Sequence, residues 1–209
     1  MDTTDAADLI AELKEERSDN EAQDKFNGRA ALLIAVIAAV LAIGGLGGGN
    51  ATDDMVLNTI RASDTWAFYQ AKNVRQTAYE IELAELKARL PHATGADRAE
   101  LEARIAEYAA TVARYDREPD AEAPNDPLRG EGKKQLRAQA EAFEAEREAA
   151  MNQDDNFDFA EVALQLALVL GSVAILATNR ATLVAAGLLG AVGTLLTLNG
   201  FLLLFPLPF

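Results

Sequence analysis

The side chains of this sequence that come nearest to a reactive site are one histidine and one acidic cluster. His92 follows Pro91 in a turn, and the chain has no second histidine and no cysteine. Oxygen-bearing side chains follow one another as in a calcium loop at Asp154, Asp155, Asn156, Asp158 and Glu161. A calcium loop also needs a glycine at its sharp turn and a glutamate in twelfth place, where Gln165 stands. We expect these carboxylates to cap the following helix, with a weak cation site as the lesser alternative.

The glycine cluster between residues 44 and 49 does not complete a dinucleotide-binding fingerprint. Gly45 and Gly47 would need a third glycine at position 50, where Asn50 stands, and the run before them is as long as a membrane span. The sequence therefore offers no nucleophile, general base, metal site or cofactor loop. We expect a protein that is not an enzyme, with no catalytic residue, cofactor or metal.

The charged residues are strongly segregated along the chain. The 209 residues have a formal charge of -14, and 13 charged residues fall in 1–29, none in 30–50, 37 in 51–158 and two in 159–209. A soluble domain mixes charged and apolar residues, so a single soluble core is excluded. Because no basic stripe is present to neutralise phosphates, we expect no nucleic-acid partner.

Three uncharged stretches are long enough to cross a lipid bilayer as helices. They are residues 30–50, 159–178 and 181–205. A crossing needs about 20 apolar residues, and a chain this short could not wrap three such helices in a soluble shell. The predicted fold class is all-α, an integral membrane protein with three transmembrane helices and a helical coiled-coil domain between the first and second.

The orientation follows from the basic residues beside these stretches. Lys25 and Arg29 precede the first span, and Arg180 lies in the short turn between the second and third. Acidic residues border the opposite side. Since basic residues favour the cytoplasm, we expect a cytoplasmic N-terminus and residues 51–158 on the other side of the membrane.

The middle segment, 51–158, is predicted to contain three helices. Residues 52–90 lack Pro and Gly and carry a heptad of Ile60, Ala67, Val74, Ile81 and Ala88, with the preceding glycines as a hinge. After a turn at 91–95, Asp97 and Glu100 form a capping box. The helix they begin has the clearest coiled-coil seam, at Leu101, Ile105, Tyr108, Val112 and Tyr115.

The two ends of the middle segment are less regular. Three prolines and two glycines make 118–132 a loop or a disordered tip, and a third helix over about 133–151 places Leu136, Ala140, Phe143 and Ala150 on one face. The acidic segment 1–29 has an apolar patch of Leu9, Ile10 and Leu13. A mobile tail and a docking helix remain equal alternatives for it.

The most distinctive stretch runs from Asp64 to Arg75, with the sequence DTWAFYQAKNVR. Together with the preceding apolar helix and the continuation to Leu90, it resembles a bacterial membrane family described only as domain of unknown function 4337. The resemblance spans nearly the whole chain and implies a multi-pass protein of the bacterial inner membrane. It implies no activity, and no catalytic residue is carried over from it.

Two interpretations of this stretch are open. In the first, its aromatic residues pack against the other helices, and Gln70 and Lys72 form hydrogen bonds across the bundle. In the second, Trp66, Tyr69, Lys72 and Arg75 form a cation–π or partner-docking patch. The candidate interaction residues are the seam of the second helix and five residues of this stretch: Trp66, Tyr69, Gln70, Lys72 and Arg75.

Two functional hypotheses follow from the pattern. The first is a non-enzymatic membrane-anchored coiled-coil protein that assembles with copies of itself or docks an unidentified protein partner. The alternative is an oligomeric channel or transporter component in which Thr194, Thr197 and Asn199 line a path. No ionisable residue lies at the middle of a span, which disfavours an ion-coupled transporter.

Overall fold

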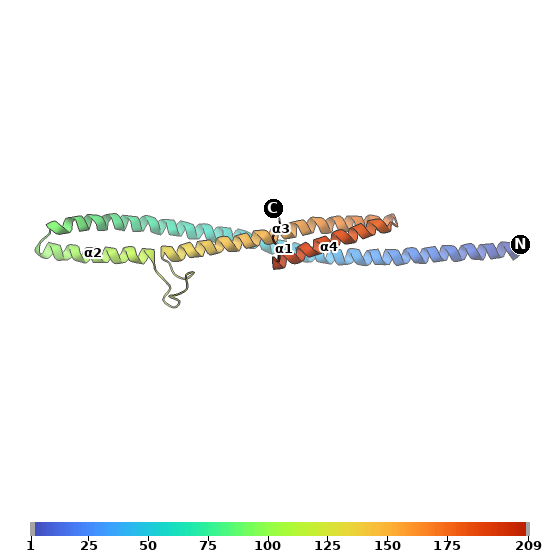
Figure 1. Cartoon of the computed structure of the whole chain (residues 1–209), viewed down its shortest axis with the longest axis horizontal. Helices are drawn as coiled ribbons and strands as arrows, with labels where there is room; N and C mark the ends of the chain where they lie inside the picture. Colours follow the sequence, from blue (N-terminus) through green and yellow to red (C-terminus); the bar gives the residue numbers. More distant parts are fainter. Residues whose placement is uncertain (1–2, 208–209) are drawn as a thin grey trace. The chain divides into compact units, whose positions relative to one another are not determined.

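The computed structural model describes residues 3–207, and the chain is all-helical, as the sequence predicts (Figure 1). Its elements in chain order are α1 (Thr3–Arg89), the short 3-10 helix η1 (Leu90–His92), α2 (Gly95–Asp116), α3 (Lys133–Leu176) and α4 (Arg180–Leu202). By length and composition, α1, α3 and α4 each contain a stretch that could cross a membrane. The fourth helix ends three residues before the predicted end of the last span.

Two of the helices join segments that the sequence analysis treats as separate. The acidic segment, the first apolar stretch and the helix at 52–90 form the single helix α1, and the third middle helix runs on into the second apolar stretch as α3. A change from charged to apolar residues does not interrupt the backbone hydrogen bonds of a helix, and no proline stands at either junction. The carboxylates near 154 thus lie inside α3, so the capping interpretation is wrong; Asp154 instead accepts a hydrogen bond from Thr52 Oγ1 at 2.8 Å.

The start of α2 also differs from the prediction. The N-cap residue is Thr94, whose side chain makes no capping hydrogen bond, and the helix begins at Gly95 with φ of +59°. A capping box at Asp97 and Glu100 is therefore wrong. Asp97 lies in the first turn of the helix, where a negative charge is favoured by the helix dipole.

The chain divides into two compact units. The first contains the residues up to Thr52 and those from Ala150 onward, and the second contains Asp53–Ala149. In the first unit, Ile37 of α1 packs against Leu164 and Ala167 of α3. Gly193 of α4 allows close approach here, because a Cβ at that position would lie 2.6 Å from Leu164 Cγ.

Among the glycines at 44–49, Gly47 allows close packing of aromatic side chains. The helix α1 continues through this stretch without a break. A Cβ at Gly47 would lie 2.5 Å from Phe157 Cζ and 2.8 Å from Phe201 Cζ, whereas a Cβ at Gly45 would meet nothing within 4 Å. Phe157 and Phe201 contact each other edge to face, with ring centroids 4.9 Å apart. Because Gly47 has no Cβ, this aromatic pair can occupy the space beside it.

Polar side chains inside the first unit bond to one another. Asn199 is 1% exposed, and its Nδ2 donates to Asn156 Oδ1 at 2.7 Å and to the carbonyl of Phe205 at 2.9 Å. The hydroxyl groups of Thr194 and Thr197 donate to backbone carbonyls one turn earlier in α4. These three side chains, expected to line a path in the channel hypothesis, have intramolecular partners.

In the second unit, α2 and the beginning of α3 lie end to end along α1 and run antiparallel to it (Figure 1). On one side of the α2–α3 junction the contacts are made by α2, such as Gln76 Nε2 donating to the carbonyl of Val112 at 3.3 Å. Contacts on the other side are made by α3, such as Trp66 Nε1 donating to Glu144 Oε1 at 2.9 Å. The segment 117–132 leaves the pair of helices at the junction.

A glycine-to-alanine pair tests the packing role of Gly47. Gly47→Ala should lower the thermal midpoint of the full-length chain, because the new methyl group must displace the aromatic pair at a cost of roughly 1–3 kcal/mol. Gly45→Ala, the control two residues away, should raise the midpoint slightly, because alanine favours the helix by about 1 kcal/mol. Circular dichroism of both variants measures the difference. Equal midpoints would contradict the packing role.

Candidate interaction site

The aromatic residues of the distinctive stretch face the other helices of the second unit. Trp66 and Tyr69 are half-buried and contact each other edge to face, with ring centroids 5.5 Å apart. Tyr69 also lies beneath the ammonium group of Lys133 from α3, which is 5.9 Å from the ring centroid. This arrangement agrees with the aromatic part of the packing interpretation, whereas Gln70, one of the two polar residues that it named, is exposed.

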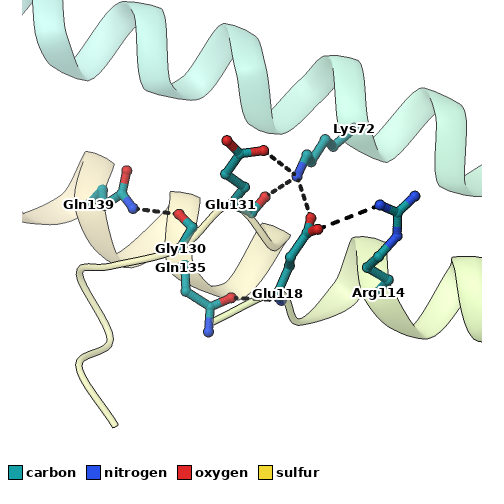
Figure 2. Close-up of polar contacts among 7 residues, drawn as sticks. All are labelled: Lys72, Arg114, Glu118, Gly130, Glu131, Gln135 and Gln139. Carbon is teal, nitrogen blue, oxygen red and sulfur yellow. Dashed lines mark hydrogen bonds and ion pairs between the residues drawn. The ribbon is translucent and has the colours of Figure 1, made fainter. Parts of the chain in front are cut away.

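Lys72 lies at the α2–α3 junction and contacts both sides of it (Figure 2). The residue is 5% exposed, and its Nζ donates to Glu118 Oε2 at 3.1 Å and to the carbonyl of Glu131. The Glu131 carboxylate lies 3.6 Å away, and the rings of Phe68 and Tyr115 flank the ammonium group at 5.2 and 5.9 Å. A buried ammonium group is tolerated only when paired, and here its partners come from both ends of the connecting segment.

The connecting segment is closed at its base. Pro119 and Gly130 form an isolated antiparallel bridge, and the amide of Glu131 donates to the carbonyl of Glu118 at 2.9 Å. Gly130 has φ of +119°, and a Cβ there would lie 2.3 Å from that carbonyl oxygen. Only glycine allows this approach. The segment predicted as a loop or disordered tip is a loop whose two ends are held together at the α2–α3 junction. We call this pairing of Glu118 and Pro119 with Gly130 and Glu131 the neck of the loop.

An ion pair holds the outer part of this loop. Arg129 Nη2 lies 2.8 Å from Asp120 Oδ2, and the amide of Glu122 donates to Asp120 Oδ1 at 2.8 Å. The Glu122 amide lowers the pKa of Asp120 below its ordinary value of 3.8, and the Arg129 guanidinium lowers it further, while partial desolvation acts in the opposite direction. The ionised carboxylate is thus the form that the folded loop favours.

The predicted seam of α2 lies against α1. Its five members, Leu101, Ile105, Tyr108, Val112 and Tyr115, are all half-buried. Tyr79 of α1 contacts two of them, with ring centroids 5.3 Å from Tyr108 and 5.9 Å from Tyr115. These residues are therefore brought together with Lys72 in one inner contact between α1 and α2.

The remaining two candidate residues, Gln70 and Arg75, are exposed on α1 and are not part of this inner contact. The docking patch imagined from Trp66, Tyr69, Lys72 and Arg75 is thus divided between two faces of the helix. Leu9 and Ile10 of the N-terminal patch have side chains outside the described residues, and Leu13 is 56% exposed.

The face of α1 that packs inward is not the heptad that the sequence makes most visible. Its buried positions include polar residues: Asn58, Ala62, Lys72, Gln76, Leu83 and Leu86. With the half-buried Trp66, Tyr69 and Tyr79 between them, all spacings are three or four. Ile60, Ala67, Val74, Ile81 and Ala88 are all exposed. We call these five, with their apolar neighbours Val56, Ala71, Ala78 and Ala84, the outer stripe; every one of the nine is exposed.

The outer stripe is the surface that sequence reasoning missed as a separate site. The heptad of Ile60 and Val74 is visible in the sequence, but the sequence does not show that another face of the same helix contacts α2 and α3. The signal that could have separated the faces is a second 3-4 spacing containing Tyr69, Lys72 and Tyr79. Gln76, which completes this spacing, hid it, because a glutamine is most often a solvent-facing residue.

The described residues provide no cluster of three His, Asp or Glu side chains that could hold a metal ion. Their polar groups instead form hydrogen bonds and ion pairs between helices. The fold and the surfaces together define an all-helical chain with three apolar helices and a helical second unit.

The match to a known family agrees with this class. The family model for a domain of unknown function, number 4337, matches residues 26–203. The chain belongs to that family, as the sequence resemblance predicted. No curated protein and no solved structure matches the chain.

Replacing Lys72 should open the neck of the loop. Lys72→Met keeps the apolar stem but removes the ion pair and the bond to the Glu131 carbonyl, at a local cost of about 1–2 kcal/mol. Hydrogen exchange of the amides at 118–132 should become roughly 5–30 times faster in the full-length chain. Lys87→Met, at an exposed lysine of the same helix, should leave these amides unchanged. Unaltered exchange in the Lys72 variant would show that the ammonium group does not hold the neck.

Acid should loosen the same loop through Asp120. Because its folded-state pKa is lowered, the stabilisation is fully present above about pH 3.8 and is lost as the pH falls through the lowered value. Hydrogen exchange at 120–130, corrected for the intrinsic effect of pH, should therefore rise in this acidic window. Asp120→Asn should remove the rise. A rise of equal size in that variant would assign the acid sensitivity to another group.

Proposed function

We propose that the chain is a non-enzymatic, membrane-anchored helical protein that assembles with copies of itself at a bacterial inner membrane. The membrane anchor is supported by the apolar stretches of α1, α3 and α4 and by their tight small-residue packing in the first unit. Apolar side chains cover the outside of that unit, including Leu32, Val169 and Leu188, which are 67%, 60% and 65% exposed. Exposure of such an apolar surface to water would be unfavourable, whereas contact with lipid would not be.

Self-assembly is supported by the outer stripe. Its large residues are well exposed, with Ile60 at 53%, Val74 at 70% and Ile81 at 66%. A strict seven-residue period is the pattern of a helix that packs along a second helix, and α1 already packs against α2 and α3 through different residues. Intervening alanines allow two helices to approach closely. The second copy is the partner that carries the same period and an equally apolar face.

The free energy gained by burying the outer stripe between two chains explains why a membrane anchor would accompany it. Burying the exposed half of a valine or isoleucine contributes about 1 kcal/mol, so Val56, Ile60, Val74 and Ile81 on two chains contribute roughly 8 kcal/mol. Association of free molecules costs about 4–15 kcal/mol. Two free chains would associate weakly at best. Confinement to one membrane raises the effective concentration and lowers this cost.

The proposed orientation is the one that the sequence predicts. Lys25, Arg29 and Arg180 gather at one end of the first unit, where they line the same pocket. The positive-inside rule favours the cytoplasm for this end, with residues 51–158 on the opposite side. The channel alternative has less support, because Thr194, Thr197 and Asn199 already bond within the chain.

The absence of cysteine allows a direct test of the outer stripe. Val74→Cys should form disulfide-linked dimers in reconstituted membranes, because two stripes would bring the two sulfur atoms together. Arg75→Cys, one residue further along and exposed on the flank, is the matched control and should cross-link at least several-fold less. Adding Ile81→Glu to the Val74→Cys chain should abolish the dimer, because it buries a charge in the contact.

Two results would contradict self-assembly through this surface. One is equal cross-linking at positions 74 and 75, which indicates random collision. The other is a chain that stays monomeric at every ratio of protein to lipid. When the same variant is expressed in native membranes, a cross-linked product that contains a different protein would instead favour the docking of a partner, the other half of the original hypothesis.

A further inference from the structure

An unpaired basic pocket lies at one end of the first unit. Lys25 and Arg29 of α1 and Arg180, the first residue of α4, line an open pocket of about 430 Å³. Lys25 and Arg29 are four residues apart, so they lie on one face of the helix. The rest of the lining is apolar and includes Phe26, Leu183 and Val184. Three positive charges and an apolar wall thus meet in one place.

These cations differ from several basic residues of the second unit in having no carboxylate partner among the described side chains. Lys72, Arg114, Arg129 and Lys134 each lie within 4 Å of a carboxylate. Among the described side chains, none of the three pocket cations forms such an ion pair. In a chain of net charge -14, three cations left together without a counterion are a site for an anion from outside the chain.

The lining identifies the chemical class of this anion. Three cations suit a phosphate group, which offers several oxygen acceptors and at least one full negative charge. Phe26, Leu183 and Val184 would contact an apolar substituent of the same molecule. A phosphodiester that carries acyl chains satisfies both halves of the pocket, whereas inorganic phosphate satisfies only the basic half.

The position of the pocket along the chain agrees with this ligand. Arg29 directly precedes the first apolar stretch, and Arg180 separates the second from the third. Basic pockets at such helix ends meet lipid headgroups. Glu21 and Asp24, which precede the two cations on α1, are not part of the lining. The acidic residues nearby therefore leave the pocket itself positive.

We propose that Lys25, Arg29 and Arg180 bind the phosphate of an anionic phospholipid, with its acyl chains against Phe26, Leu183 and Val184. This inference rests on the membrane insertion proposed above and is independent of the outer stripe. The pocket would select negatively charged lipids from the bilayer that surrounds the three apolar helices, and would hold one at the junction of α1 and α4.

Native mass spectrometry of the full-length chain tests the assignment. The chain is released from nanodiscs of phosphatidylcholine that contain a minority of phosphatidylglycerol, and the retained lipids are identified. Phosphatidylglycerol should be retained in preference to phosphatidylcholine. Each cation contributes about fivefold, so Lys25→Gln with Arg29→Gln should weaken retention roughly 25-fold. Lys14→Gln with Arg17→Gln removes the same charge from α1 outside the pocket and should leave retention unchanged.

Three results would overturn the proposal. The first is equal retention of the two lipids, and the second is equal weakening by both double variants, which indicates attraction to net charge alone. The third is displacement of phosphatidylglycerol by inorganic phosphate at matched concentration, because the ligand would then be a soluble anion. Resistance of the chain to carbonate extraction is measured in the same membranes. Extraction of the unaltered chain would overturn membrane insertion itself, whereas resistance without lipid preference would overturn only the pocket.

Discussion

The unbroken course of α1 is the constraint on which the other features depend. This helix has 87 residues, and it contributes to both compact units. Because its backbone is not interrupted, a seven-residue period anywhere along it returns to the same face. In the second unit one such face contacts α2 and α3, and another, the outer stripe, is exposed in the described part of the chain. The missing Cβ of Gly47 allows an aromatic pair to approach the helix.

The two faces of α1 differ in polarity, and each polarity suits a different kind of contact. The inner face contains Lys72 and Gln76, whose partners come from α2 and from the neck of the loop. A misaligned pairing would leave these polar groups buried without partners, at a cost of about 1–3 kcal/mol each. The inner face therefore fixes one alignment of the helices. The outer stripe has only apolar contacts to offer, which suits reversible association of copies confined to a membrane.

Much of the helical architecture could be predicted from the sequence. Apolar length located the three stretches that are long enough to cross a membrane, and prolines and glycines located the loop and the turn before α2. The helix boundaries could not be predicted in the same way, since the acidic residues near Asp154 look like a helix start yet lie inside α3. The backbone hydrogen bonds of a helix continue where charged residues give way to apolar ones. The composition of the sequence shows only that change and not the continuity of the helix.

The candidate site was predicted less well than the fold. The seam of α2 was found because large residues such as Tyr108 repeat at regular spacing. On α1, the packing interpretation expected Lys72 to form hydrogen bonds across the bundle but could not name the acceptors, because they are 46 and 59 residues away in the sequence. The pairing of such distant groups depends on where α2 ends and α3 begins, which no local pattern states. The sequence placed Lys25, Arg29 and Arg180 on one side of the predicted membrane, but it could not show that they line one pocket, because Arg180 is far from the other two in the sequence.

The most direct measurement of the central claim is the distance between copies at the outer stripe. Spin labels can be attached to a cysteine introduced at Val74 in the otherwise cysteine-free chain, and their dipolar coupling can be recorded in lipid membranes. Packed helices have axes about 8–10 Å apart, so the account predicts a narrow distribution of label separations within about 20 Å. A broad distribution that shifts as the membrane is diluted with lipid would contradict it.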